Sequence, residues 1–502
     1  MDDHRLDVLA ATVIAIAAAF VNLAVFSSPH GIPCLTPDSA TYTHWTVSRT
    51  PGYPAMLNAV LATTGSIWWI VPVQLNIYLA ATVVMGWVMG TGFQNRFVTL
   101  FVVLGSWCIA PLIMTTWQVM TESLYASIIC LHIAAILCLI RNRSTLASVM
   151  AGVTAGLLVA VRTSGYSFVA ALTILVVVFR REVRTIVFPM AGTALCVFAI
   201  TLAAQYVKHR VYTTQSFAGF SLAGHVAPLI TEDLHTAYPD LTKRIARRIA
   251  PVMGDPERSP LAPNHASASA NTFNFLLYRH VVPETIAYAR QASPSFDYTN
   301  LWIVGNGIAM DIALSAIWEN PAWYVFHSTS HYFSLWDQFL ASYITFDHAL
   351  AQCRHQSIAL IRESPSSYPN FELSWYEKDR PQPISRSEPL TAWLDAVWEL
   401  LKPLWIACVK LLLPLTVVGA LWMMLHFPPP SPIMAVTYLG TALQSNLLFL
   451  AFTQPAIYRY VVPLMPFVVV IIVGWVTLGM NRISQTCALA HQKDDLAPKI
   501  AD

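Results

Sequence analysis

Acidic residues close to the long apolar segments are the first candidates for chemistry in this chain. Once the polar region 206–402 and the two chain ends are set aside, three remain: Asp38, Glu122 and Glu182. Glu182 lies between arginines in a basic turn at 180–184, which is typical of a solvated loop. An ionisable group at membrane depth costs at least about 2.5 kcal/mol unless it is paired or solvated. Asp38 and Glu122 are therefore candidate catalytic residues.

Basic residues accompany these two carboxylates. Arg49, Arg162 and Arg459 all map to the same predicted side of the membrane, and Lys410 lies about a third of the way into an apolar run. A carboxylate can act as a general base towards a hydroxyl group. A guanidinium group binds phosphate oxygens through paired hydrogen bonds. A reaction that needs both would use a lipid-bound phosphate as leaving group and a hydroxyl as acceptor.

Each of these residues also has an ordinary structural explanation. Asp38, within Thr36-Pro37-Asp38-Ser39, equally suits a turn or a helix N-cap. Glu122 begins an apolar run, where the helix dipole stabilises a carboxylate. Arg162 and Lys410 can extend from a helix to reach the interface. The sequence alone leaves these alternatives open.

The composition defines the class of protein that carries these residues. The chain has 502 residues, of which 56% are hydrophobic and 11% charged, whereas a soluble domain carries about 25% charged residues. Its mean hydropathy is +0.53, its net charge is +2 and its pI is about 8.1, so no strong field attracts polyanions. These values exclude a soluble enzyme, a disordered regulator and a nucleic-acid binder. They predict an all-α polytopic membrane protein.

Ten apolar runs are long enough to cross a bilayer or nearly so. They lie at about 8–26, 67–90, 97–113, 119–140, 146–162, 165–180, 185–205, 403–426, 432–452 and 458–480. The segments that connect these runs on one side of the membrane hold ten basic residues, and the connections on the other side hold three. Because basic residues favour the cytoplasmic side, both termini are predicted to be cytoplasmic, as in a bacterial inner or plasma membrane.

The same pattern predicts the domain organisation. Residues 1–205 form an N-terminal transmembrane module with a first outer loop at 27–66, and 403–480 form the C-terminal transmembrane helices before a cytoplasmic tail at 481–502. Residues 206–402 hold 15 of the 29 basic and 18 of the 27 acidic residues. Because unstructured loops longer than about 15 residues are uncommon, this region is predicted to be a large extracytoplasmic loop domain.

Cysteines and histidines give two weaker expectations. Cys34 and Cys353 both fall in predicted outer segments, but the sequence does not give their separation, so a disulfide between them stays open. His327 and His331 are four residues apart and share a helix face, yet no third ligand is evident for a metal. No cofactor is indicated, and a requirement for a divalent cation stays open.

Four short motifs hold the candidate residues. They are Asp38-Ser39-Ala40-Thr41-Tyr42 with Arg49-Thr50-Pro51-Gly52-Tyr53-Pro54, then Thr121-Glu122-Ser123-Leu124, Ala160-Val161-Arg162-Thr163 and Ile457-Tyr458-Arg459-Tyr460-Val461-Val462-Pro463. These motifs resemble those of membrane glycosyltransferases of the GT-C class, in the branch with protein O-mannosyltransferases and the aminoarabinose transferases of lipid A. The resemblance covers about residues 1–205 and 403–480.

The resemblance implies a GT-C-like fold and an inverting transfer on the extracytoplasmic face. The donor would be a polyprenyl-phosphate sugar and the acceptor a hydroxyl group of a glycan, lipid or protein, with Asp38 as base. Many members carry an acidic pair in the first loop, whereas Ser39 follows Asp38 here. Either Glu122 supplies the second carboxylate, or the chemistry uses one acid.

The residues expected to bind phosphate or sugar are three arginines and three tyrosines: Arg49, Arg162, Arg459, Tyr42, Tyr53 and Tyr458. The tyrosines suit an interfacial aromatic belt equally well. Two other functions stay open. A polysaccharide polymerase or ligase with a lipid-pyrophosphate donor needs the same arginines. A flippase or transporter of lipid-linked sugars would carry charges across the membrane midplane, whereas here they stop at the outer face.

Overall fold

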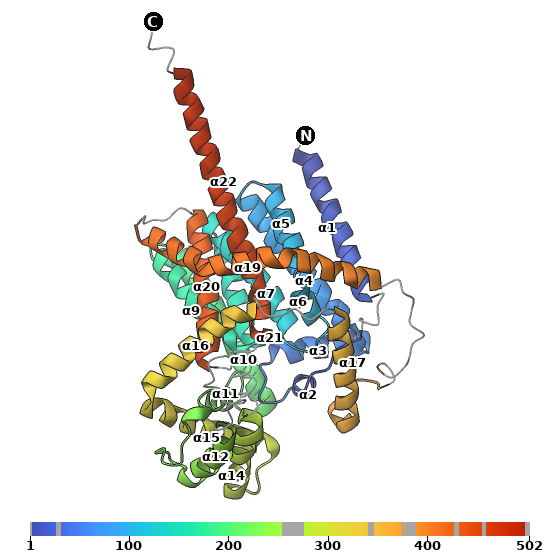
Figure 1. Ribbon diagram of the computed structural model, residues 1–502, viewed down its shortest axis with the longest axis vertical. Coiled ribbons are helices and arrows are strands. Elements are labelled where there is room, and N and C mark those ends of the chain that lie inside the picture. The colour runs from blue at the N-terminus through green and yellow to red at the C-terminus, as the bar shows by residue number, and fades with distance from the viewer. Residues whose placement is uncertain are drawn as a thin grey trace.

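The computed structural model describes residues 3–26, 32–253, 276–339, 346–373, 376, 388–425, 431–453 and 458–496. Within these residues the chain is built from helices and contains no β-strand (Figure 1). The predicted all-α class is therefore confirmed. The helices form an upper body, which includes α1 (Asp3–Phe26) and α22 (Met465–Leu496), and a lower lobe, which contains α12 (Pro239–Met253), α14 (Val282–Ala292) and α15 (Tyr298–Glu319) (Figure 1).

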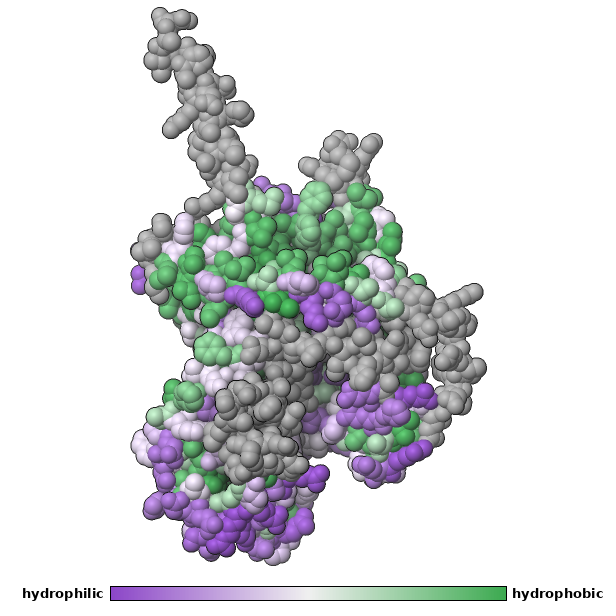
Figure 2. Space-filling view, in the orientation of Figure 1, coloured by the Kyte–Doolittle hydropathy of each residue, from purple (hydrophilic) through white to green (hydrophobic). Residues whose placement is uncertain are grey.

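Seven helical segments in the described part of the chain are long and apolar enough to cross a membrane, so this is an integral membrane protein. They are Ile67–Gly92 with α4, Glu122–Asn142 (α7), Val183–His209 with α10, Tyr298–Glu319 (α15), Asp395–Trp422 within α19, Ile433–Thr453 within α20 and Val462–Met480 with α22. Figure 2 shows the matching hydrophobic surface on the upper body and a hydrophilic surface on the lower lobe.

Six of these seven segments coincide with predicted apolar runs, and α15 is additional. The four other predicted runs are also helical, with shorter apolar segments: Asp7–Leu23 within α1 (Asp3–Phe26), α5 (Arg96–Trp107), α8 (Thr145–Val161), and Thr163–Val178 with α9 (Tyr166–Val178). Ten spanning helices thus remain a prediction. From the sequence, the residues of α15 were predicted to belong to the extracytoplasmic loop domain at 206–402.

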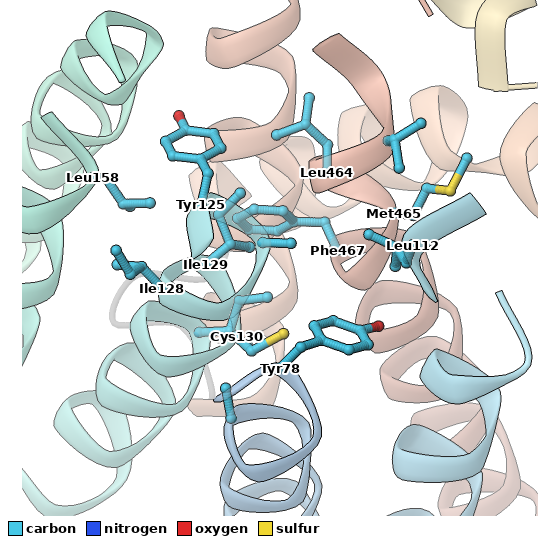
Figure 3. Close-up of a cluster of buried hydrophobic side chains, with 14 of the residues drawn as sticks. Tyr78, Leu112, Tyr125, Ile128, Ile129, Cys130, Leu158, Leu464, Met465 and Phe467 are labelled. Atoms are coloured by element: carbon cyan, nitrogen blue, oxygen red, sulfur yellow. The ribbon is translucent and has the colours of Figure 1, made fainter. Parts of the chain in front are cut away.

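The core of the upper body lies between α4, α7, α8 and α22 (Figure 3). Tyr78, Ile129 and Phe467 are fully enclosed in it. The Tyr125 hydroxyl points away from this apolar cluster (Figure 3). Because buried hydroxyl groups need hydrogen-bond partners, its direction indicates a polar layer above the core, where the candidate site lies.

Close helix packing orders the N-terminal module. Gly152 and Gly156 of α8 face α10 (Phe188–His209), so that a Cβ atom on Gly152 would overlap the carbonyl oxygen of Met190. Two glycines four residues apart let two membrane helices approach closely. The end of α8, which carries Arg162, is thereby held in a fixed position.

A second core belongs to the lower lobe. It is formed by α11 (Ala218–His225), α12 (Pro239–Met253), α14 (Val282–Ala292) and α15. The next helix in the chain, α16 (Pro321–Phe339), packs against α20 (Ser431–Thr453). The lobe therefore has its own hydrophobic interior and a helical connection back to the membrane helices.

The first loop is attached to a segment more than 300 residues away. Cys34 forms a disulfide with Cys353 of α17 (Phe346–Glu363), and their Cα atoms are 5.5 Å apart. The backbone nitrogen of Leu35 donates to Ser357 Oγ over 3.0 Å. The disulfide that the sequence left open is thus formed, and it fixes the start of the first loop.

Two long helices of the C-terminal region run in different directions. In Figure 1, α19 (Glu388–Leu425) runs across the view, whereas α22 (Met465–Leu496) runs along its length. α19 packs against both α20 and α22. The predicted C-terminal helices are all present, but they do not form a parallel bundle.

Candidate functional site

The first loop forms an ion pair around Asp38. This residue directly precedes the short helix α2 (Ser39–Thr43), yet its side chain makes no capping hydrogen bond. Instead its Oδ1 accepts a hydrogen bond of 2.5 Å from Arg49 Nη2. Arg49 also donates to Thr41 Oγ1 over 2.7 Å and to the Tyr42 hydroxyl over 3.2 Å. The Asp38 carboxylate therefore binds an arginine and does not cap the helix.

The loop that precedes α7 lies beside this ion pair. Cys34 donates its backbone N–H to the carbonyl of Trp117 over 2.7 Å and accepts from Val119 over 2.9 Å. Ser39 Oγ donates to the carbonyl oxygen of Val119 over 3.1 Å. These bonds join the two loops side by side and bring Glu122, the first residue of α7, towards Asp38.

Glu122 is paired with the second arginine. Its Oε1 lies 3.5 Å from Nη1 of Arg162; the Glu122 side chain is buried and that of Arg162 is largely buried. The Arg162 guanidinium lies over the ring of Tyr460, 4.5 Å from the centroid, and 5.9 Å from that of Tyr125. A buried cation gains from such aromatic faces. Glu122 therefore does more than begin a helix, because its charge is balanced by Arg162.

Close contact between α3 (Gly52–Thr64) and the end of α8 holds Arg162. Thr50 Oγ1 donates to the carbonyl of Val161 over 2.7 Å. A Cβ atom on Gly52 would lie only 2.8 Å from the carbonyl oxygen of Ala160. Only glycine fits at this approach, which explains the glycine in the segment that follows Arg49.

A polar network supports the other side of Arg162. Asn446 of α20 donates to the Tyr125 hydroxyl over 3.3 Å and to Ser167 Oγ over 2.9 Å. Ser164 Oγ donates to the same Tyr125 hydroxyl over 3.0 Å. Because α7, α9 and α20 meet in this network, the tyrosine ring beneath Arg162 is rigidly placed.

The charged side chains surround a narrow pocket of about 50 Å³. This volume holds roughly three to five water molecules or a group the size of a phosphate. It is lined by Tyr42, Arg49, Thr50, Met120, Glu122, Val161, Arg162, Thr163, Gln215, Phe217 and Tyr460. We call it the charged pocket, and with Asp38 it contains two carboxylates and two guanidinium groups.

Tyr42 lies in the electrostatic field of all four charges. Burial raises the pKa of Tyr42 above its usual value, and the positive charge of Arg49 partly opposes that shift. The phenol is therefore protonated at neutral pH and available as a hydrogen-bond donor. Because Tyr42 lines the same pocket as Arg49 of one ion pair and both members of the other, the two ion pairs belong to a single site.

The other predicted residues are distributed differently. Tyr53 is enclosed in the core, donates its hydroxyl to Gln74 over 2.9 Å, and packs edge-on against the Tyr42 ring. Lys410 is exposed on α19 and lies apart from the pocket. Tyr458 and Arg459 belong to α21 (Tyr458–Val461), but their side chains lie outside the described residues.

Seven residues of the pocket lining were not among the predicted site residues: Thr50, Met120, Val161, Thr163, Gln215, Phe217 and Tyr460. Gln215 and Phe217 follow α10 in a segment without periodicity, so only the fold brings them to the pocket. Gln215 donates to Thr163 Oγ1 over 3.1 Å and thereby covers the turn after Arg162. Tyr460 directly follows Arg459, and that adjacency was the one signal available in the sequence.

A separate cluster of three imidazoles lies between α11 and α16. The ring of His225, the last residue of α11, is 4.9 Å from that of His327 and 4.8 Å from that of His331. The two α16 rings are 4.1 Å apart. The third histidine that the sequence analysis missed is thus supplied by a helix about 100 positions earlier, which no spacing rule would find.

No protein-family model, curated protein or solved structure matches this chain. Function therefore has to be argued from the residues and geometry of the charged pocket.

Proposed function

We propose that the protein is an inverting glycosyltransferase of the GT-C type, which moves a sugar from a polyprenyl-phosphate donor to a hydroxyl acceptor. The observation that carries the proposal is the joining of two carboxylates and two arginines around one pocket, with the phenol of Tyr42 in its lining. A general base and a phosphate-binding group are the two functions that this reaction requires.

The residues divide the reaction between them. Asp38 takes the proton of the acceptor hydroxyl, whose oxygen forms a bond to the anomeric carbon of the sugar. The bond from that carbon to the phosphate oxygen breaks, and polyprenyl phosphate leaves with the electron pair. Arg49 holds Asp38 in its ionised form, since a neighbouring positive charge favours the carboxylate. Arg162 and Tyr42 stabilise the negative charge that grows on the leaving phosphate.

Charge balance gives a role to the third arginine. Two carboxylates and two guanidinium groups sum to zero, so a phosphate entering this pocket brings an uncompensated negative charge. Arg459 directly precedes Tyr460, whose ring covers Arg162. We expect Arg459 to supply the additional cation when the donor binds.

An apolar pocket in the membrane helices suits the donor's hydrocarbon chain. It has a volume of about 540 Å³ and lies between α5, α19 and α22, with Cys108 and Ile109 at one end. The chain continues from Ile109 through α6 (Ala110–Thr115) to the loop bonded to Cys34. A prenyl chain held there would leave its phosphate near the first loop.

Two observations support a location of the pocket outside the cytoplasm. One is the excess of basic residues at the opposite helix ends. The other is the Cys34–Cys353 disulfide, because stable disulfides form mainly in oxidising compartments. A cysteine introduced at exposed Ser366 should react with an impermeant thiol reagent in intact cells, and one at Arg143 should not. Labelling at Arg143 alone would reverse the orientation.

The decisive experiment supplies purified protein in vesicles with labelled donors and a membrane acceptor fraction. The proposal predicts that polyprenyl-phosphate sugar is consumed and polyprenyl phosphate is released. Consumption of a polyprenyl-pyrophosphate glycan only would identify the polymerase or ligase function instead. Movement of an intact lipid-linked sugar across the vesicle membrane, without cleavage, would identify a transporter.

A further inference from the structure

The three-histidine cluster stands apart from the charged pocket and joins the lower lobe to the membrane helices. His225 ends α11, while His327 and His331 lie one turn apart on α16. All three side chains are buried, and their donor nitrogens lie within 4.8 Å of one another. Three imidazoles in so small a buried volume resemble the ligand set of a transition-metal ion.

We infer that these three histidines bind Zn²⁺, or a divalent ion of similar preference, and thereby fasten α11 to α16. The ligands come from two helices, and the (i, i+4) spacing of His327 and His331 places both on the face that meets His225. The described cluster consists of imidazoles and contains no carboxylate. Imidazole nitrogen suits Zn²⁺, whereas Mg²⁺ and Ca²⁺ require oxygen ligands.

The geometry needs only a small adjustment. Zinc–nitrogen bonds of about 2.0–2.1 Å in a tetrahedral site put the ligand nitrogens about 3.3 Å apart. In the structure the ligand nitrogens lie within 4.8 Å of one another, so rotation of the imidazole side chains would bring them to this distance. Ser328 Oγ, 3.2 Å from His225 Nε2, lies close enough to orient a ring or a bound water in the fourth position.

The surroundings favour a structural role for the ion. Trp323 stacks on the His327 ring at 4.5 Å, and the ring of Tyr324 lies 6.0 Å from that of His225. These aromatic contacts surround ligands that are already buried, whereas a catalytic zinc keeps one position open to substrate.

The ion would also stabilise the approach to the charged pocket. Tyr324 of α16 donates to the carbonyl of Phe452 over 2.6 Å, and Ser221 of α11 donates to that of Thr453 over 3.0 Å. Both acceptors lie in the last turn of α20. Phe217, just before α11, lines the pocket itself. Fixing α11 to α16 therefore holds these contacts in one arrangement.

Metal content gives the direct test, and it does not depend on the glycosyltransferase proposal. Purified full-length protein is stripped with a chelator, reloaded with Zn²⁺, freed of excess ion and analysed by mass spectrometry. Wild-type protein should retain one ion per chain, and the variants His225→Ala, His327→Ala and His331→Ala should retain background amounts. His355→Ala, which removes an exposed histidine of α17, is the matched control and should retain the ion.

A spectroscopic measurement on wild-type protein keeps the inference testable if a variant fails to fold. Co²⁺ in a tetrahedral nitrogen site gives strong visible absorption, which added Zn²⁺ should abolish. X-ray absorption of the zinc-loaded protein should show imidazole scattering, and Zn²⁺ should raise the Tm of the wild type but not of His225→Ala. Wild-type protein that retains no ion, or folded histidine variants that retain it fully, would overturn the assignment.

Discussion

Glu122 and Glu284 are both paired with arginine, one in the charged pocket and the other in the lower lobe. Glu122 lies 3.5 Å from Arg162, whereas Glu284 lies 2.8 Å from Arg248 and 3.4 Å from Arg244. By distance alone, the pairing in the lower lobe is the better one. The arginines differ more: the Arg162 side chain is 12% exposed and that of Arg248 is 56% exposed.

The two sites differ in how deeply the arginine side chain is buried. An exposed arginine remains solvated whether or not it is paired, so its ion pair contributes little to stability. A buried arginine depends on its partner, because removing one charge leaves the other in a medium of low dielectric constant. A protein keeps such a pair despite its desolvation cost when the charges have a use, which favours the charged pocket as the functional site.

The strongest test of this contrast is Asp38→Asn. Asparagine keeps the size and most hydrogen bonds of aspartate but cannot accept the acceptor's proton, so sugar transfer should fall by about 10²–10⁴-fold. Donor binding should persist, which equilibrium binding of labelled polyprenyl-phosphate sugar would measure. If Asp38 were only a helix cap, asparagine would serve equally well and transfer would be nearly normal.

Glu122→Gln is the necessary companion to that variant. A loss of transfer equal to that of Asp38→Asn, at normal protein yield, would mean that the two carboxylates share the reaction or that Glu122 is the base. A smaller loss would leave Glu122 as the partner that positions Arg162.

The second test compares the two arginines directly through stability. Arg162→Ala leaves the Glu122 carboxylate buried without its cation, which should cost about 3–5 kcal/mol. A marked fall in Tm of the detergent-purified protein is therefore expected. The double variant Arg162→Ala with Glu122→Gln should recover part of the loss, because it removes both charges. Equal instability of the single and double variants would show that the charge of Glu122 is not the cause.

The sequence predicted the charged residues of the pocket better than their arrangement. Apolar periodicity predicted the helices. Asp38 and Glu122 were noticed because acidic residues are rare near the apolar segments. Which arginine pairs with which acid could not be predicted, since Glu122 and Arg162 meet only because α7 and α8 are antiparallel neighbours. His225 illustrates the same limit, because its approach to His327 and His331 depends on packing between distant segments, which local patterns do not encode. The α15 segment differs, since its length and apolar composition are local features of the sequence.

A subtler test concerns Arg49. Arg49→Lys keeps the positive charge near Asp38 but cannot contact Asp38, Thr41 and Tyr42 together as the guanidinium group does. Loss of one hydrogen bond to a charged group corresponds to about a tenfold fall in transfer, and Arg49→Ala should fall further. A lysine variant with wild-type kcat/KM would show that only the charge is needed there. Arg459→Lys tests the proposed phosphate contact in the same way.

The smallest effect is expected in the lower lobe. Arg248→Ala removes the shorter of the two contacts to Glu284, yet Arg244 remains 3.4 Å from the same carboxylate. Because Arg248 is largely exposed, the loss should not exceed about 1 kcal/mol, and sugar transfer should be unchanged. Thermal unfolding and transfer assays beside Arg162→Ala make the comparison direct. A loss of stability as large as that of Arg162→Ala would show that burial of the arginine does not distinguish the two sites. The buried ion pair would then no longer support the charged pocket as the functional site.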